Sequence, residues 1–133
     1  MEVNTIYNNI LLIDDDPASI YVTKSILEKA GIGNKIFTAG NGLEGLNLLI
    51  KHCLENDCEG QDLIIVDLKM PVMDGFKFLE YYNNLEDKIK VRIKIIVLSS
   101  SVNPRDFKKT KDLGIVDYIV KPLTKREIHR LIN

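Results

Sequence analysis

The chain of 133 residues is 45% hydrophobic and 28% charged, with a formal net charge of −1. These values are typical of one globular domain with a real core, and they argue against a nucleic-acid binder, which would be basic. No apolar run approaches the ~20 residues of a membrane span and the N-terminus lacks a basic-then-apolar signal segment, so we expect a cytoplasmic protein with no membrane contact.

The first predicted elements are a strand and a helix that follow a polar lead-in. The apolar run from Asn9 to Ile13 predicts a strand. Asp16 followed by Pro17 is the pattern of an N-cap with proline at the first helical position. The apolar stripe that follows predicts a helix as far as Ala30, and Gly31 and Gly33 end it.

A second strand and helix are predicted next. The strand is the short run from Lys35 to Thr38, and the helix opens at Asn41 with apolar residues at helical spacing as far as Cys53. Residues 54–62 have no periodicity and predict a loop or a frayed helix end. Cys53 and Cys58 lie on either side of polar residues, and we expect free thiols in the cytosol.

The central stretch of the chain is residues 63–75. Leu63 to Val66 is an uninterrupted apolar run, typical of a strand buried on both faces. It ends in Asp67, and Pro71 with the Asp74-Gly75 pair then breaks the chain into a loop. An aspartate at the end of a buried parallel strand lies where open α/β sheets bind ligands.

Helices and strands continue to alternate to the end of the chain. In order they are a helix carrying Phe76, Leu79 and Tyr82, a charged linker from Glu86 to Arg92, a strand from Ile93 to Leu98, a helix from Pro104 that Gly114 ends, a strand from Asp117 to Val120 and a helix from Thr124 to Leu131. Five strand–helix alternations predict an α/β fold with a parallel sheet and helices on both faces. We find no repeat and no second domain.

Residues that can carry chemistry follow four of these strands. Asp14 and Asp15 follow the first strand, Asp67 the third, Ser99 the fourth and Lys121 the fifth. Three carboxylates at one sheet edge disfavour one another's ionisation and need a counter-charge. Mg²⁺ binds carboxylates and keeps sites for phosphate oxygens, so the pattern indicates a magnesium site facing a lysine.

With these strand ends, the chain resembles the response regulator receiver domain of two-component phosphorelays. The resemblance rests on the Asp14-Asp15 pair, the stretch from Asp67 to Gly75, the Ser99 hydroxyl and Lys121 followed by Pro122, and it covers nearly the whole chain. It implies a flavodoxin-like (CheY-like) fold, a five-stranded parallel sheet in the order 2-1-3-4-5. It also implies a single receiver domain over residues 1–133 without an output domain.

The resemblance further implies the role of each site residue. Asp67 accepts a phosphoryl group, with Ser99 and Lys121 contacting the phosphoryl oxygens. Mg²⁺ is held by Asp15, Asp67 and the backbone carbonyl of Lys69, and by Asp14 often through water. Asp16 lies outside the family's acidic pair, and we interpret it as the N-cap of the first helix and not as a Mg²⁺ ligand.

A switch and a cis peptide bond are also implied. Ser99 would move toward the phosphoryl group, and Tyr118 would turn inward into the space that it leaves. The Lys121-Pro122 bond is expected to be cis, which would aim the Lys121 ammonium at Asp67. Lys69 and Ser101 flank the site and are expected to tune the lifetime of the phosphoryl group.

The expected partners are other proteins. A histidine kinase or histidine phosphotransfer protein would donate the phosphoryl group. A downstream target would dock on the fourth helix, fifth strand and fifth helix. The basic residues of these helices either dock an acidic partner or form a plain solvated face; they are Arg105, Lys108, Lys109, Lys111, Lys125, Arg126 and Arg130. We expect a monomer or weak dimer and no nucleic-acid partner.

Two other classes share parts of this pattern. A haloacid-dehalogenase-type phosphatase also uses a strand-end aspartate with Mg²⁺, but its signature needs a threonine where this chain has Ala18, and 133 residues leave no room for a cap. A flavodoxin-like flavin carrier needs a phosphate-cradling loop after the first strand, where this chain has three carboxylates.

Overall fold

Five parallel strands form one sheet in the order β2-β1-β3-β4-β5 in the computed structural model, which describes residues 7–55 and 61–132. The strands are β1 Tyr7–Ile13, β2 Gly33–Ala39, β3 Asp62–Val66, β4 Ile93–Ser99 and β5 Tyr118–Val120. The predicted strand order is confirmed. β1, β3 and β4 lie in the middle of the sheet and carry the most uniformly buried residues.

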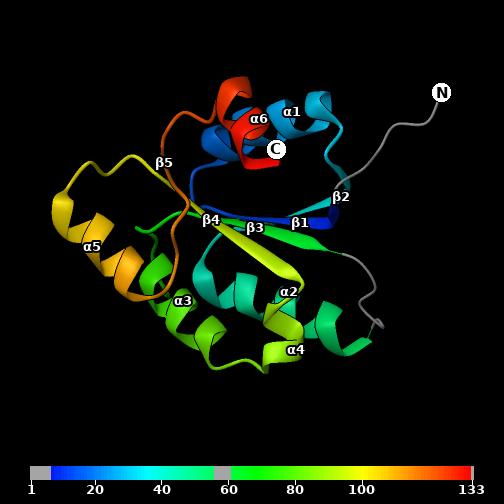
Figure 1. The fold of residues 1–133 in the computed structure, drawn as a ribbon, viewed down its shortest axis with the longest axis vertical. Helices are drawn as coiled ribbons and strands as arrows, with labels where there is room; N and C mark the ends of the chain where they lie inside the picture. The colour runs from blue at the N-terminus through cyan, green and yellow to red at the C-terminus, as the bar shows by residue number, and fades with distance from the viewer. Residues whose placement is uncertain (1–6, 56–60, 133) are drawn as a thin grey trace.

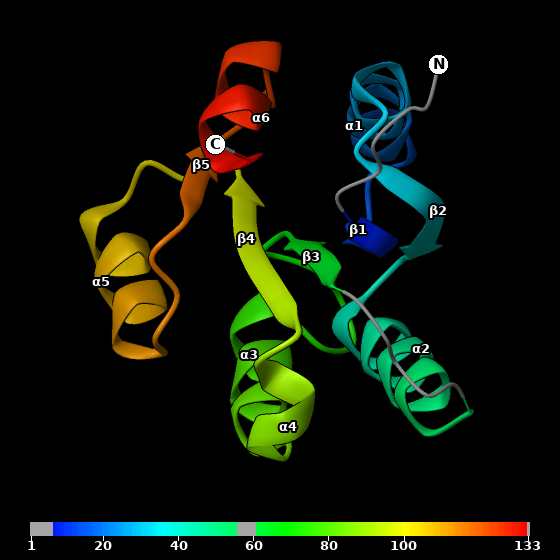
Figure 2. The ribbon, with the colours of Figure 1, turned by 45° about the vertical axis from the view of Figure 1, so that its right-hand side comes forward.

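Helices cover both faces of the sheet, as predicted. They are α1 Pro17–Ala30, α2 Gly42–Glu55, α3 Gly75–Asn83, α4 Asp87–Lys90, α5 Pro104–Asp112 and α6 Lys125–Ile132. Figure 1 shows α1 and α6 on one face and α2, α3 and α4 on the other. In Figure 2, α5 lies beside β4 and β5 at the edge of the sheet. The central strands, whose ends carry the predicted site residues, are therefore shielded from solvent on both faces of the sheet.

Two apolar clusters, one on each face of the sheet, form the core. Successive residues of β1 alternate between them, with Leu11 and Ile13 in the cluster under α2 and α3, and Ile10 and Leu12 in the cluster under α1 and α6. The alternation follows from the period of two in a β-strand. Because both faces are buried, the central strands read as unbroken apolar runs in the sequence.

The ends of α1 are set by local chemistry. The Asp16 carboxylate accepts a hydrogen bond from the Ala18 N–H, and Pro17 occupies the first helical position. Gly31 closes the helix in the left-handed conformation, with φ of 64°, and donates its N–H to the carbonyls of Leu27 and Glu28. The predicted cap at Asp16 and the stop at Gly31 are confirmed, whereas Gly33 is the first residue of β2. The cap directs the chain from the end of β1 directly into the helix.

Several boundaries differ from the predicted ones. β1 begins at Tyr7 and β2 spans Gly33–Ala39, because backbone pairing between these strands continues past the apolar residues that the pattern detects. The linker predicted from Glu86 to Arg92 contains the single helical turn α4. The helix predicted from Pro104 is therefore α5, and the last helix is α6.

Helix α5 has few side chains that anchor it to the rest of the domain. Thr110 is its one buried side chain, and Phe107 is its one large apolar residue. The side chain of Cys53 and all of Cys58 lie outside what the structure describes. None of the helices in the described part of the chain has an apolar stretch that could span a lipid bilayer.

Candidate functional site

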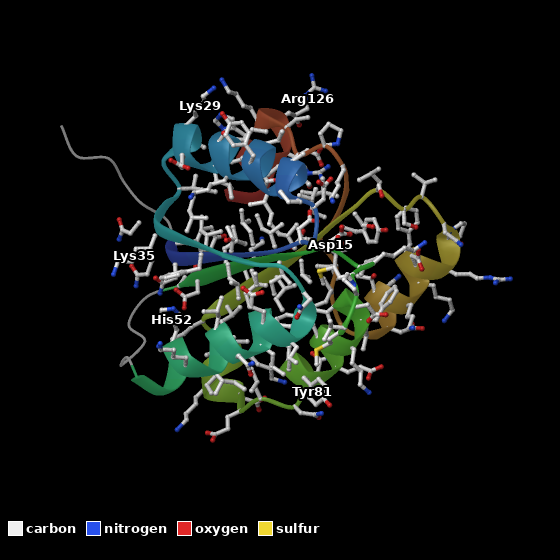
Figure 3. The ribbon with its side chains drawn as sticks, turned by 180° about the vertical axis from the view of Figure 1, so that it is seen from behind. Asp15, Lys29, Lys35, His52, Tyr81 and Arg126 are labelled. Carbon is white, nitrogen blue, oxygen red and sulfur yellow. The ribbon has the colours of Figure 1, made fainter. Side chains whose placement is uncertain are left out.

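The register of the sheet places the ends of β1 and β3 side by side. Ile13 of β1 pairs with Val66 of β3. Asp14 and Asp67 are the next residues after this pair, so they follow the ends of two neighbouring strands. The Asp67 N–H donates to the Ile13 carbonyl at 2.9 Å, which continues the ladder by one step. Figure 3 shows Asp15 at this end of the sheet, beside the start of α1.

The three predicted carboxylates converge at this edge. One oxygen from each of Asp14, Asp15 and Asp67 lies within 4.8 Å of the others. Asp14 and Asp67 are buried, and Asp15 is exposed. The cluster thus has two carboxylates held by the sheet and a third that faces solvent. Oxygen donors of this kind suit Mg²⁺.

Lys121 supplies the counter-charge from the end of β5. Its ammonium donates to Asp14 Oδ2 at 2.8 Å and to Asp67 Oδ2 at 3.0 Å. Burial alone would lower the pKa of Lys121, but the hydrogen bonds and charges of Asp14 and Asp67 outweigh burial, and its pKa is raised. The Lys121-Pro122 bond is cis, as predicted. The lysine is therefore held in its charged form between two carboxylates.

Each buried carboxylate divides its two oxygens between the backbone and the lysine. Asp67 Oδ1 accepts the Leu68 N–H at 2.7 Å, and Asp14 Oδ1 accepts the Asp16 N–H at 3.0 Å. The Oδ2 atoms of both residues face Lys121. These contacts fix the orientation of both carboxylates before any ligand binds.

Ser99 and Tyr118 lie on neighbouring strands near this edge. Ser99 is 2% exposed, and its Oγ accepts the Ser101 N–H at 3.2 Å. Tyr118 is half-buried, and its hydroxyl donates to the Ser101 carbonyl at 3.0 Å while its ring meets the Phe107 ring edge-on. Neither side chain is hydrogen-bonded to Asp67 within the part of the chain that is described.

Lys69, in the loop after β3, has an exposed side chain, and among the described residues this side chain makes no hydrogen bond or ion pair with the three carboxylates. The same loop contains Val72, a residue that the sequence patterns did not identify. Val72 has a φ of 69° and is 80% exposed. It is the central residue of a γ-turn in which the Met73 N–H donates to the Pro71 carbonyl at 2.8 Å. A β-branched residue gives no sequence signal for this conformation.

Asp106 is a second residue that the sequence analysis did not single out. It lies in the first turn of α5, where its carboxylate accepts the Ser101 hydroxyl. Asn103 caps the same helix by accepting the Arg105 N–H at 3.0 Å. An asparagine followed three residues later by an acid is a helix-start pattern that could have indicated this carboxylate.

Comparison with known proteins shows relatives with similar sequences. A family model described as the response regulator receiver domain matches residues 10–133. The chain is 34% identical over 124 residues to the probable C4-dicarboxylate response regulator DctR of Bacillus subtilis (strain 168), which covers 93% of this chain and 50% of that protein. It is 26% identical over 124 residues to the sensor histidine kinase GacS of Pseudomonas protegens (strain DSM 19095 / LMG 27888 / CFBP 6595 / CHA0), covering 92% of this chain and 12% of that one. The chain thus spans half or less of the length of these relatives.

A solved structure is similar as well. The two component response regulator from Cytophaga hutchinsonii superposes with a TM-score of 0.83 at 25% identity, over 96% of this chain and 95% of that one. Receiver domains are signalling domains of two-component systems rather than enzymes of the usual kind, so the phosphatase alternative is not favoured. The family model covers the strands, the acidic cluster and the lysine described above, and the chain belongs to the response regulator receiver domain family.

Proposed function

We propose that this chain accepts a phosphoryl group on Asp67 and signals by the resulting change in its surface. The observation that carries the proposal is the Lys121 ammonium, which lies between the buried carboxylates of Asp67 and Asp14 while Asp15 is within 4.8 Å of both. A lone acidic loop has no need of a lysine held between its carboxylates. A site that gathers negative phosphoryl oxygens does need one.

The residues fit a bound Mg²⁺ ion. Asp15 and Asp67 would hold it directly with the backbone carbonyl of Lys69, and Asp14 would do so through water. Three clustered carboxylates against one lysine leave negative charge to be neutralised. When bound, Mg²⁺ would supply the remaining positive charge and coordinate a phosphoryl oxygen.

The transfer step makes one bond and breaks one. An oxygen of the Asp67 carboxylate bonds to phosphorus as the N–P bond of a phosphohistidine breaks, and the histidine nitrogen keeps the electron pair. Such transfers depend mainly on positioning and on charge neutralisation. Lys121 neutralises the developing charge, and the Ser99 hydroxyl donates to a phosphoryl oxygen.

The new dianionic group would change the surrounding contacts. Ser99 would approach the phosphoryl group, and Tyr118 would turn into the space that Ser99 leaves. Tyr118 packs against Phe107 of α5, so its movement would alter the α5 surface. The single buried side chain of α5 gives that helix low local stability, which suits a movable element.

The proposed partners follow from this chemistry. A histidine kinase or histidine phosphotransfer protein donates the phosphoryl group, and a downstream protein docks on α5, β5 and α6. We propose that residues 1–133 act as one receiver domain, as a monomer or weak dimer. The chain would catalyse only its own phosphorylation and dephosphorylation.

The test is incubation with acetyl phosphate and Mg²⁺ followed by intact mass measurement. The expected result is a gain of roughly 80 Da, for one phosphoryl group. The gain should be absent with EDTA and absent in Asp67→Asn, which keeps the shape of the side chain. A gain that persists in Asp67→Asn would sink the assignment of the acceptor, and steady release of phosphate from p-nitrophenyl phosphate over many turnovers would indicate a phosphatase instead.

A further inference from the structure

Ser101 connects the phosphorylation site to helix α5 through hydrogen bonds. Its N–H donates to Ser99 Oγ at 3.2 Å, and its carbonyl accepts the Tyr118 hydroxyl at 3.0 Å. Its hydroxyl donates to the Asp106 carboxylate and accepts the Asn103 N–H at 3.2 Å. All polar groups of Ser101 are therefore engaged, and the two residues of the proposed switch, Ser99 and Tyr118, are both hydrogen-bonded to the backbone of this one residue.

The bond between Ser101 and Ser99 affects what the Ser99 hydroxyl can do. Because Ser99 Oγ accepts a backbone N–H, one side of the oxygen is occupied and its own proton is directed elsewhere. Ser99 is 2% exposed, so water has little access to that proton. The hydroxyl is thus held as a donor for whatever ligand enters the site.

Asp106 fixes the position of Ser101 itself. A carboxylate accepting from a hydroxyl makes a stronger hydrogen bond than a neutral acceptor would. Asp106 belongs to the first turn of α5, next to Phe107, whose ring packs against Tyr118. The same turn of helix therefore holds Ser101 through a hydrogen bond and Tyr118 through ring contact.

We propose that Asp106 is a positioning residue for the Ser99 hydroxyl, acting through Ser101. This inference rests on the proposed function, because it assigns Ser99 as a donor to the phosphoryl group. When the Asp106 carboxylate is present, the Ser101 N–H holds the Ser99 hydroxyl so that the hydroxyl proton can be donated to a ligand. When the carboxylate is lost, the backbone of Ser101 is free to shift, and both Ser99 and Tyr118 lose the residue to which they are hydrogen-bonded.

A purely local role for Asp106 makes a different prediction. An acid in the first turn of a helix also stabilises the helix through its dipole. If that were its whole role, Asp106→Ala would lower the stability of α5 and leave ligand binding at the site unchanged. The two roles are separated by measuring binding of a phosphoryl mimic and of Mg²⁺ alone.

The experiment measures binding of beryllofluoride in the presence of saturating Mg²⁺, by calorimetry or ¹⁹F NMR. Asp106→Ala should weaken beryllofluoride binding about fivefold, the usual effect of losing one hydrogen bond, and leave the affinity for Mg²⁺ alone unchanged. Asp106→Asn keeps an acceptor oxygen for the Ser101 hydroxyl and should restore most of the affinity. Ser101→Ala keeps the Asp106 carboxylate in the first turn of α5 and the hydrogen bond from the Arg105 N–H to the Asn103 side chain. It should weaken binding as Asp106→Ala does, and it serves if Asp106→Ala does not fold.

Two controls make the outcome decisive. Asp112→Ala removes another carboxylate of α5, one that pairs with Lys108 at 2.9 Å on the exposed side, and should leave beryllofluoride binding unchanged. In a Ser99→Ala background, Asp106→Ala should have no further effect on beryllofluoride binding. Wild-type affinity in both Asp106→Ala and Ser101→Ala, or a full fivefold loss that persists without the Ser99 hydroxyl, would overturn the inference. Failure of the wild type itself to bind beryllofluoride or to gain a phosphoryl group would instead overturn the proposed function.

Discussion

Gly75 approaches Asp67 so closely that no side chain fits between them. A Cβ on Gly75 would lie 2.1 Å from the Asp67 carbonyl oxygen and 2.9 Å from its carbonyl carbon. The Gly75 N–H also donates to the Leu68 carbonyl at 2.9 Å, which closes the loop between β3 and α3. The backbone that carries the proposed acceptor is therefore in contact with the start of the next helix.

The first prediction concerns this contact. Gly75→Ala should lower the free energy of unfolding by about 2–4 kcal/mol, because the clash is with backbone that cannot move aside without opening the loop. Urea denaturation measures the change. Gly40→Ala is the matched control, since its Cβ would meet only the flexible end of Glu44, at 3.5 Å, and should be close to neutral. Equal effects for the two substitutions would contradict the prediction.

The second prediction concerns the strained turn in the same loop. Val72 has a φ of 69°, which is costly for a β-branched residue, so Val72→Gly should raise the free energy of unfolding by about 1 kcal/mol. Val116→Gly is the control at an equally exposed valine, 83% exposed, that is not among the residues with positive φ. At Val116 no strain is relieved, so the greater conformational entropy that glycine gives the unfolded chain should lower the free energy of unfolding. Thermal unfolding of both variants checks the difference, and a loss of stability in Val72→Gly equal to that in Val116→Gly would refute strain at Val72.

The third prediction concerns Lys121. Lys121→Met should lower the free energy of unfolding by about 2 kcal/mol in the absence of Mg²⁺, because two buried carboxylates lose their counter-charge. The loss is smaller than for a fully buried pair, since the lysine side chain is 19% exposed. Lys88→Met, at an exposed ion pair with Glu86, is the control and should change stability little. Stability unchanged in Lys121→Met would show that the ammonium is not needed to hold the carboxylates together.

The fourth prediction concerns Asp15, the exposed member of the acidic cluster. Without Mg²⁺, Asp15→Ala should raise the melting temperature by roughly 2 °C, because it removes like-charge repulsion from Asp14 and Asp67. Added Mg²⁺ should stabilise the wild type by mass action and stabilise the variant less. Melting curves recorded with EDTA test the first expectation, and melting curves recorded with Mg²⁺ test the second. A lower melting temperature for the variant in EDTA would mean that Asp15 has a structural role.

The fifth prediction concerns alkaline pH. Burial raises the pKa of Tyr7, and the charge of Asp117 raises it further; the pKa of Lys121 is also raised, by Asp14 and Asp67 against the effect of burial. Both groups keep their proton in the folded state at a pH where the unfolded chain has begun to lose it. Their contribution to stability is therefore complete below about pH 10 and is lost as the pH rises through the folded-state values.

Urea unfolding between about pH 8 and pH 11.5 tests this dependence. The free energy of unfolding should fall across the upper part of that range, and Tyr7→Phe should make the fall shallower because the contribution of Tyr7 is gone. Tyr21→Phe is the control at a side chain that is 75% exposed, and the slope there should match the wild type. An unchanged slope in Tyr7→Phe would show that Tyr7 does not contribute.

The location of the site at the sheet edge was predictable because it depends on features that are local in sequence. The apolar runs that end in Asp14 and Asp67 identify buried strands, and parallel strands necessarily bring their carboxyl ends to one edge. Asp16 was predictable as the helix cap for the same reason, since its partner Ala18 is two residues away. The roles of the site residues remain proposals that rest on family resemblance and on the geometry of the lysine.

The order and type of the main elements, and the residues that end them, could therefore be predicted from local patterns along the chain. Strand burial and helix capping depend on neighbours along the chain, so their patterns can be read there. The hydrogen bonds of Lys121 to both Asp14 and Asp67, and the bond between Ser101 and Asp106, became visible only in the folded domain. The same holds for the positive φ of Val72. These features depend on how close separate segments approach after packing, to within a few tenths of an ångström, and no periodicity in the sequence encodes such distances.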